Sequence, residues 1–110
     1  MNAGDLRFRV TVLSAEANKL PNGERTTTYR PSVRLWADVR PESAKEEIES
    51  ARAATAAMWT VYFRFRPSVV STDRLAFHFA GQSVTLDIIG ITHDSKRTWT
   101  RAVCREAEQL

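Results

Sequence analysis

The residues with the most evident chemical potential are two arginines in the stretch WTVYFRFRPS. Arg64 and Arg66 fall on one side of an extended chain, while Val61, Phe63 and Phe65 fall on the other. A guanidinium group forms planar, bidentate hydrogen bonds, so these arginines suit carboxylates of a partner protein or phosphates of a nucleic acid. The third interpretation is a solvated sheet face with cross-strand ion pairs, each contributing only about 0.2–1 kcal/mol.

The three tryptophans point to a surface that other molecules cover. Trp36 and Trp99 fall on the polar side of their predicted strands, and Trp59 opens a strand. Tryptophan that is exposed in a monomer and covered in a complex is a typical interface anchor. The pattern therefore favours a protein that oligomerises or docks. A small nucleic-acid-binding β-barrel is the alternative, because Tyr62 and Trp59 beside the two arginines could stack on bases.

Residues suited to metal binding or catalysis are few and scattered. His78 and His93 have no second ligand at a metal-binding spacing, so we expect no metal site. Cys104 is the single cysteine, which excludes an intramolecular disulfide, and we expect it to be a buried apolar thiol. The sequence has no nucleophile elbow and no phosphate-binding glycine loop. We therefore expect no enzymatic activity and no cofactor.

Length and charge set the broad class. The 110 residues form one domain, 1–110, and carry a formal net charge of +3 with a pI near 9.5. A mildly basic surface suits DNA or an acidic partner without choosing between them. No apolar stretch approaches the roughly 20 residues that span a bilayer, and the first residues are charged. We therefore expect no association with a membrane. We also expect that the protein is synthesised in a reducing cytoplasm.

Apolar and polar residues alternate along most of the chain, which is typical of half-buried strands. The strands predicted in this way are 6–12, 26–29, 35–40, 59–66, 74–79, 84–91 and 97–104. Asn22-Gly23 is a strong turn signal, and Pro31 should confine its strand to an edge or split it into two pieces. A small sheet avoids open edges by rolling up, so we predict a mainly β fold, a small antiparallel β-barrel of about six strands.

A helical or loop insertion is predicted at about 42–58, between the third and fourth strands. Ser43 and Glu46 fit a helix capping box, and the alanine-rich remainder has good helix propensity. Its apolar stripe is thin and made of small residues. The segment should therefore be a mobile excursion or pack against another subunit.

Several motifs occur in an order that resembles a known family. They are MNAGDLRFRVTV, then LWADVRP with a glutamate-containing stretch after it, then RFRP, RLAFHFAGQSVTLDIIGI and a closing strand with Cys104 and Glu106. Together they resemble the phage head-tail joining proteins, also called head closure, adaptor or stopper proteins of tailed phages and prophages. The likeness covers nearly the whole chain.

The resemblance implies a structural virion protein with a small β-barrel core. Members form a ring beneath the portal and its adaptor, close the packaged head and offer a surface to the tail. The implied partners are portal or adaptor proteins, tail proteins and other copies in the ring, and the position in the channel would also allow contact with DNA. The protein would be made in the cytoplasm of the bacterial host and act in the virion. The insertion would point toward the channel or a neighbouring subunit.

The resemblance and the strand pattern also mark residues for contacts with a neighbouring subunit or partner. These are Arg9, Trp36, Asp38, Glu46, Glu47, Trp59, Arg64 and Arg66. We hypothesise that Arg64 and Arg66 of one copy pair with Glu46, Glu47 or Asp38 of the next, because arginine forks give small ring subunits directional contacts.

Overall fold

Six antiparallel strands make up most of the described part of the chain, residues 3–41 and 58–107 of the computed structural model. The strands are β1 (Phe8–Lys19), β2 (Arg25–Pro41), β3 (Met58–Arg64), β4 (Arg74–Phe79), β5 (Gln82–His93) and β6 (Trp99–Glu106). A 3-10 turn, η1 (Ala3–Asp5), precedes them and is the only helical element in these residues. The predicted helical or loop insertion at about 42–58 lies outside the described residues, except for Met58, which begins β3.

The sheet closes on itself in the strand order β1-β2-β3-β6-β5-β4. The prediction of a mainly β, six-stranded antiparallel fold is therefore confirmed. The pairing that closes the ring is short, because only Thr11, Val12 and Leu13 of β1 pair with β4. The sheet is thus closed in its order of strands, but the pairing of β1 with β4 is the shortest in it.

One hydrophobic core fills the inside of the closed sheet, and it follows the predicted alternation. Its fully buried side chains include Val10, Val12, Val61, Phe63, Leu75, Leu86, Ala102 and Cys104. Trp59 belongs to the same core at 6% exposure, and its ring packs edge-on against Phe77 and Phe79 with centroid distances of 5.7 and 5.1 Å. The opposite side chains of each strand face outward, which leaves the arginines on the outer surface.

The second strand differs from the prediction. Residues 25–41 form one continuous strand, so a split into two pieces at Pro31 is wrong, whereas the alternative, an edge position, is confirmed. The register passes from Val12 opposite Val33 to Leu13 opposite Pro31, which leaves Ser32 as the extra residue of a bulge. Proline is tolerated there because β2 pairs with β3 only from Ala37 onward, so at the bulge its other side is an edge. The insertion consequently follows the second strand, not the third.

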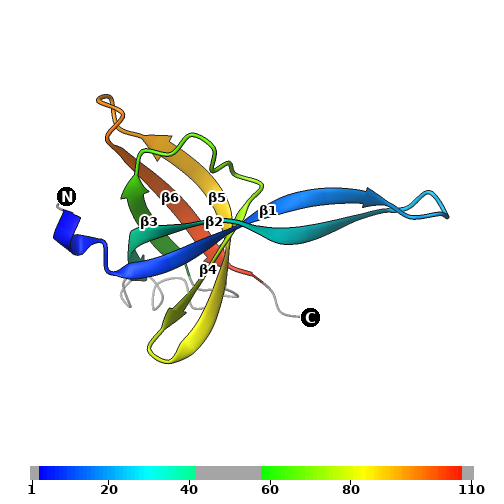
Figure 1. Ribbon diagram of the computed structural model, residues 1–110, viewed down its shortest axis with the longest axis horizontal. Helices are drawn as coiled ribbons and strands as arrows, with labels where there is room; N and C mark the ends of the chain where they lie inside the picture. Colours follow the sequence, from blue (N-terminus) through cyan, green and yellow to red (C-terminus); the bar gives the residue numbers. More distant parts are fainter. Residues whose placement is uncertain (1–2, 42–57, 108–110) are drawn as a thin grey trace, which may run out of the picture.

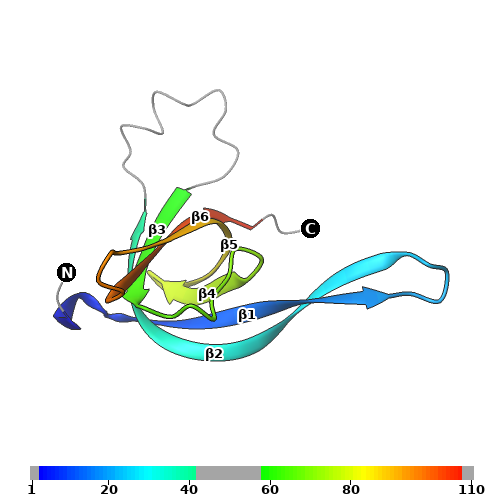
Figure 2. The ribbon, with the colours of Figure 1, turned by 90° about the horizontal axis from the view of Figure 1, so that it is seen from above.

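The first two strands continue beyond the closed sheet as a two-stranded hairpin, here called the arm, residues 14–30. It projects from the body in both ribbon views (Figures 1 and 2). The predicted turn caps it: Gly23 has a φ of 89°, and the Leu20 amide donates to the Glu24 carbonyl at 2.7 Å. Six residue pairs, Ser14 to Lys19 with Arg25 to Arg30, give the arm a length of about 20 Å.

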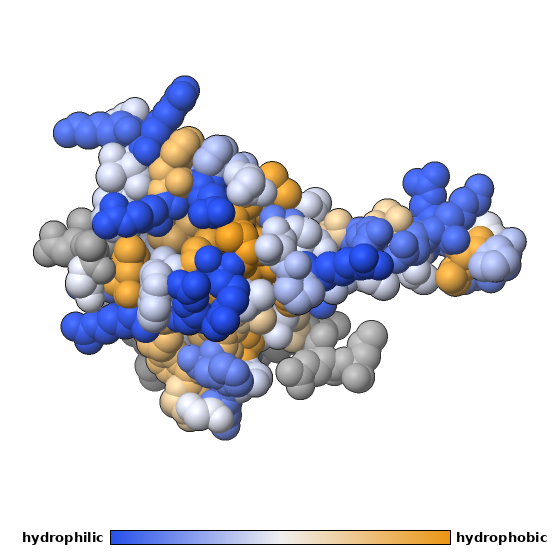
Figure 3. Space-filling view, viewed as in Figure 1, coloured by the Kyte–Doolittle hydropathy of each residue, from blue (hydrophilic) through white to orange (hydrophobic). Residues whose placement is uncertain are grey.

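Polar contacts hold the arm together and attach it to the body. Glu16 pairs with Arg30 at 2.8 Å, and the Asn18 amide donates to the Thr28 hydroxyl at 2.8 Å. At the base, the guanidinium of Arg74 lies 4.1 Å from the Tyr29 ring centroid and pairs with Asp87 on β5. The arm is therefore an ordered, mostly polar extension with exposed faces (Figure 3).

Candidate functional site

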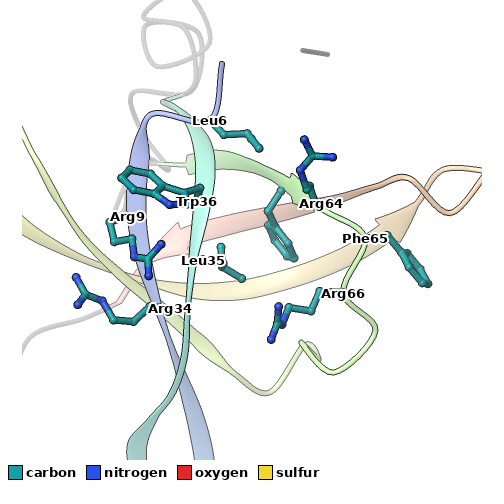
Figure 4. A pocket seen from close by; sticks show the side chains of 9 residues that line it. Leu6, Arg9, Arg34, Leu35, Trp36, Arg64, Phe65 and Arg66 are labelled. Atoms are coloured by element: carbon teal, nitrogen blue, oxygen red, sulfur yellow. The ribbon is translucent and has the colours of Figure 1, made fainter. Parts of the chain in front are cut away.

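A shallow groove of about 530 Å³ lies on the outside of the closed sheet and is rimmed by arginines. Arg9 of β1, Arg34 of β2, Arg64 at the end of β3 and Arg66 just beyond that end line it, and we call it the arginine groove (Figure 4). The other lining residues, Leu6, Leu35, Trp36, Phe63 and Phe65, are apolar, and two of them, Leu35 and Phe63, are buried core side chains. The groove thus combines an apolar lining with a cationic rim.

The strand register explains how these side chains meet. Arg9 pairs with Trp36, and Thr11 pairs with Arg34, so all four project from one face of the β1–β2 pair. The buried residues Val10 and Leu35 occupy the alternate positions. A period of two therefore places the cations outside and the core inside.

Cation–π contacts orient two of the arginines. The Arg9 guanidinium lies 5.0 Å from the Trp36 ring, and that of Arg64 lies 5.6 Å from the Trp99 ring. Trp36 is nevertheless 53% exposed. A guanidinium that stacks on a ring keeps its edge N–H groups available for an in-plane acceptor such as a carboxylate or phosphate.

Arg66 lies past the end of β3 but its backbone is fixed. The Phe65 amide donates to the Thr98 carbonyl at 2.9 Å, and the Arg66 amide donates to the Thr100 hydroxyl at 3.2 Å. The same hydroxyl is hydrogen-bonded to Nδ1 of His93 at 2.9 Å. These bonds hold the Arg66 side of the groove against β6.

Among the described residues, no carboxylate pairs with the four rim arginines. Asp38, on the same outer face, pairs instead with Arg40 at 2.8 Å, and the hydrogen bond and charge of Asp38 raise the pKa of Arg40. Asp94 is also engaged within the chain. Its carboxylate accepts hydrogen bonds from the backbone amides of Trp99 and Thr98, which lower the pKa of Asp94. The groove is therefore a concentration of positive charge that the described part of the chain does not neutralise.

Comparison with known proteins identifies the family. A model of the phage head completion protein family matches residues 1–107. The chain belongs to this family. It is a structural family, so this head completion protein is a structural component of a phage virion and not an enzyme, as the sequence predicted.

Solved structures share the fold. Protein SF1141 from Shigella flexneri 2a is similar over 100% of both chains, with 29% identity and a TM-score of 0.76. A chain in the virion of a native gene transfer agent particle is similar over 92% of this chain and 96% of its own, with a TM-score of 0.62. At 16% identity the second likeness shows the fold alone. A comparison with curated protein sequences gave no match.

The structure of this head completion protein brings together half of the predicted contact residues. Arg9, Trp36, Arg64 and Arg66 all line the arginine groove. Asp38 lies on the same outer face of β2 but is already paired, and Trp59 lies in the core, where its indole N–H donates to Glu106 at 3.3 Å. Glu46 and Glu47 lie outside the described residues.

Arg34 is a groove residue that the prediction did not select. Its signal was present in the sequence, because Arg34 and Trp36 are two residues apart and therefore share a strand face. In the described part of the chain, no three histidine, cysteine or carboxylate side chains are grouped for metal binding. No helix in that part is long and apolar enough to cross a membrane.

Cys104 gives a testable consequence of burial. Desolvation, with a smaller effect of the Asp87 charge, raises the pKa of its thiol from 9.0 to about 12. The folded protein should therefore resist a thiol reagent at pH 8 and react only as it unfolds. The folded state keeps the thiol proton that the unfolded state loses above pH 9. The free energy of unfolding that depends on this thiol is therefore fully present below pH 9 and is lost between pH 9 and 12.

Urea unfolding at pH 8 and pH 10.5 measures that loss. Between these values the free energy of unfolding should fall by about 2 kcal/mol more than in a Cys104→Ala variant, which lacks the thiol but keeps every other titrating group. Equal pH dependence of the two proteins would contradict the prediction.

Proposed function

We propose that this head completion protein is a ring subunit of the head-tail connector, where it closes the packaged head and provides a surface for tail attachment. Its family membership supports a place in the virion, and the arginine groove supports a role in assembly. The observation that carries the proposal is the cationic rim around an exposed Trp36, because arginine and tryptophan are the residues that most often anchor protein interfaces.

The positions of the groove and the arm support a head-to-tail contact between subunits. Arg9 in the groove and Lys19 near the arm tip are ten residues apart on β1, a distance of about 33 Å. Contacts between two different surfaces of one subunit generate closed rings when the rotation is right. The arm is a two-stranded ribbon, which is marginal alone and gains stability when it is covered. In this proposal each arm reaches a neighbouring subunit.

The partners in this proposal are the portal or its adaptor on one side of the ring and tail proteins on the other. The predicted contact residues Arg9, Trp36, Arg64 and Arg66 lie together in the groove and serve the contact between neighbouring copies in the ring. The channel through such a ring would carry the viral DNA, which gives a second source of anions.

A nucleic-acid-binding β-barrel is the second candidate, and the exposed Trp36 beside Arg9 is the observation that favours it. Its predicted aromatic residues are placed less favourably, because Trp59 is buried and Tyr62 lies under the guanidinium of Arg40 at 5.1 Å. Steeply salt-dependent binding of the free protein to DNA would support this candidate.

Removal of the gene from the phage tests the proposed function. Particles that lack the protein should package DNA, then leak it and remain without tails, whereas a plasmid copy of the gene should restore tailed particles. Electron microscopy and the nuclease sensitivity of the packaged DNA measure both effects. Normal tailed particles in the absence of the protein would disprove the connector role.

A further inference from the structure

The charges of this chain are divided between two regions. The described residues contain fourteen arginines and lysines against eight aspartates and glutamates. The short segment 42–49, ESAKEEIE, contains four glutamates and a single lysine. The positive surplus therefore lies on the described body, and the most acidic stretch lies in the connection between β2 and β3.

Most carboxylates of the described body already have a partner within the chain and are therefore less available to the groove of another copy. Glu16, Asp38 and Asp87 form ion pairs with arginines. Asp73 accepts the Val70 amide, and Glu106 accepts the Trp59 indole N–H. Segment 42–49, with its four glutamates, is consequently the main group of acidic side chains that a second copy could bring to the groove.

We propose that the arginine groove receives segment 42–49 of a second copy of this chain, with Glu46 and Glu47 against the arginine rim. The inference rests on the proposed ring and names the contact within it. The groove suits this occupant because glutamates flank Ile48, which matches an apolar lining between cations. A phosphate backbone would use the rim but leave the apolar lining uncovered.

The geometry of β2 favours a second copy over the chain's own segment. Trp36 lies five residues before Pro41, or about 17 Å back along the strand. Glu46 and Glu47 follow Pro41 by five and six residues, which span at most about 21 Å when fully extended. The chain's own glutamates would reach their groove only as an extended chain running back along β2. A neighbouring copy is free of that restriction.

Peptide binding to the full-length protein tests the occupant directly. The probe is a fluorescein-labelled peptide with the sequence of residues 41–50, PESAKEEIES, and its matched control carries glutamine at all four glutamates. Fluorescence anisotropy should show saturable binding of the acidic peptide. Binding should weaken at least about tenfold for the glutamine peptide, and equally for the protein variant Arg64→Glu/Arg66→Glu.

A second charge-reversal variant separates the groove from general electrostatics. Arg101 and Arg105 are exposed on β6 and do not line the groove, so Arg101→Glu/Arg105→Glu changes the net charge equally and should keep most of the binding. Equal loss in both variants, or no peptide binding, would overturn the proposal. Tighter binding of an oligo(dT) strand through the same arginines would overturn it in favour of nucleic acid. Particle maturation in the gene deletion is measured separately, so the ring proposal can survive the failure of this contact.

Discussion

Replacing Arg64 and Arg66 by glutamate should leave the protein folded and prevent its incorporation into particles. Both side chains are exposed at the arginine groove, and neither forms an ion pair within the described residues. The reversal replaces two cations of the four-arginine rim with anions. Close charge pairs at interfaces contribute about 1.5–7 kcal/mol, and a loss of about 3 kcal/mol weakens each contact roughly 100-fold. In a ring the loss is repeated at every subunit.

Complementation of the gene deletion measures this effect. The variant should yield at least about 100-fold fewer tailed particles than the wild-type gene, if particle yield follows the loss of contact affinity. The control is Arg101→Glu/Arg105→Glu, which has the same net charge and should assemble. Circular dichroism and thermal unfolding should show that both variants are folded. Normal particle yield with the groove variant would contradict the proposed role of the groove.

The parts of the fold that were predictable are those in which one sheet face is buried. Strands β3, β4 and β6, and β5 as far as Ile88, alternate because their inward residues fill the core, and a shift by one residue would expose the whole set. Glycine inside a strand is typical of a bulge, and β5 has one before Gly90, where the register shifts and exposes Ile89. Where one face of a strand is buried, the alternation of apolar and polar residues can be recognised in the sequence.

The arm was not predictable in this way because neither of its faces is buried in the chain. Residues 14–19, SAEANK, read as a polar loop, and only pairing with residues 25–30 makes them a strand. Cross-strand contacts such as Glu16–Arg30 and Asn18–Thr28 replace burial as the local stabilisation. These depend on the register, which a single sequence does not reveal.

The sequence predicted on which face of its strand each groove residue lies, but it did not predict which strands lie next to one another. Alternation placed Arg64, Arg66 and Trp36 outward, yet only the sheet order brings β1, β2 and the end of β3 around one groove. Trp59 shows the converse. Trp59 lies two residues before Val61 and four before Phe63, so alternation places all three side chains on the same face. That face is buried, and the structure accordingly has Trp59 in the core.

Shortening the arm should separate folding from assembly. Replacing residues 15–29 by Asn-Gly joins the paired residues Ser14 and Arg30 through a two-residue turn of the type that hairpins prefer. The closed sheet should remain folded, because none of the removed residues belongs to the core. The lost Tyr29–Arg74 contact and cross-strand pairs are each worth about 0.2–1 kcal/mol, so the melting temperature should fall by only a few degrees. Tailed particles should be absent, because the arm no longer reaches a neighbour.

A matched variant keeps the arm and removes only its tip. Replacing residues 20–24 by Asn-Gly joins the paired residues Lys19 and Arg25, and it should assemble if the strands of the arm make the contact. Thr27→Arg provides an independent test, since Thr27 is exposed on the face that carries Ala15 and Ala17, where a long charged side chain blocks close approach without touching the core. Loss of tailed particles with Thr27→Arg and with the shortened arm places the subunit contact on this face. Wild-type assembly of both would show that the arm takes no part in the ring.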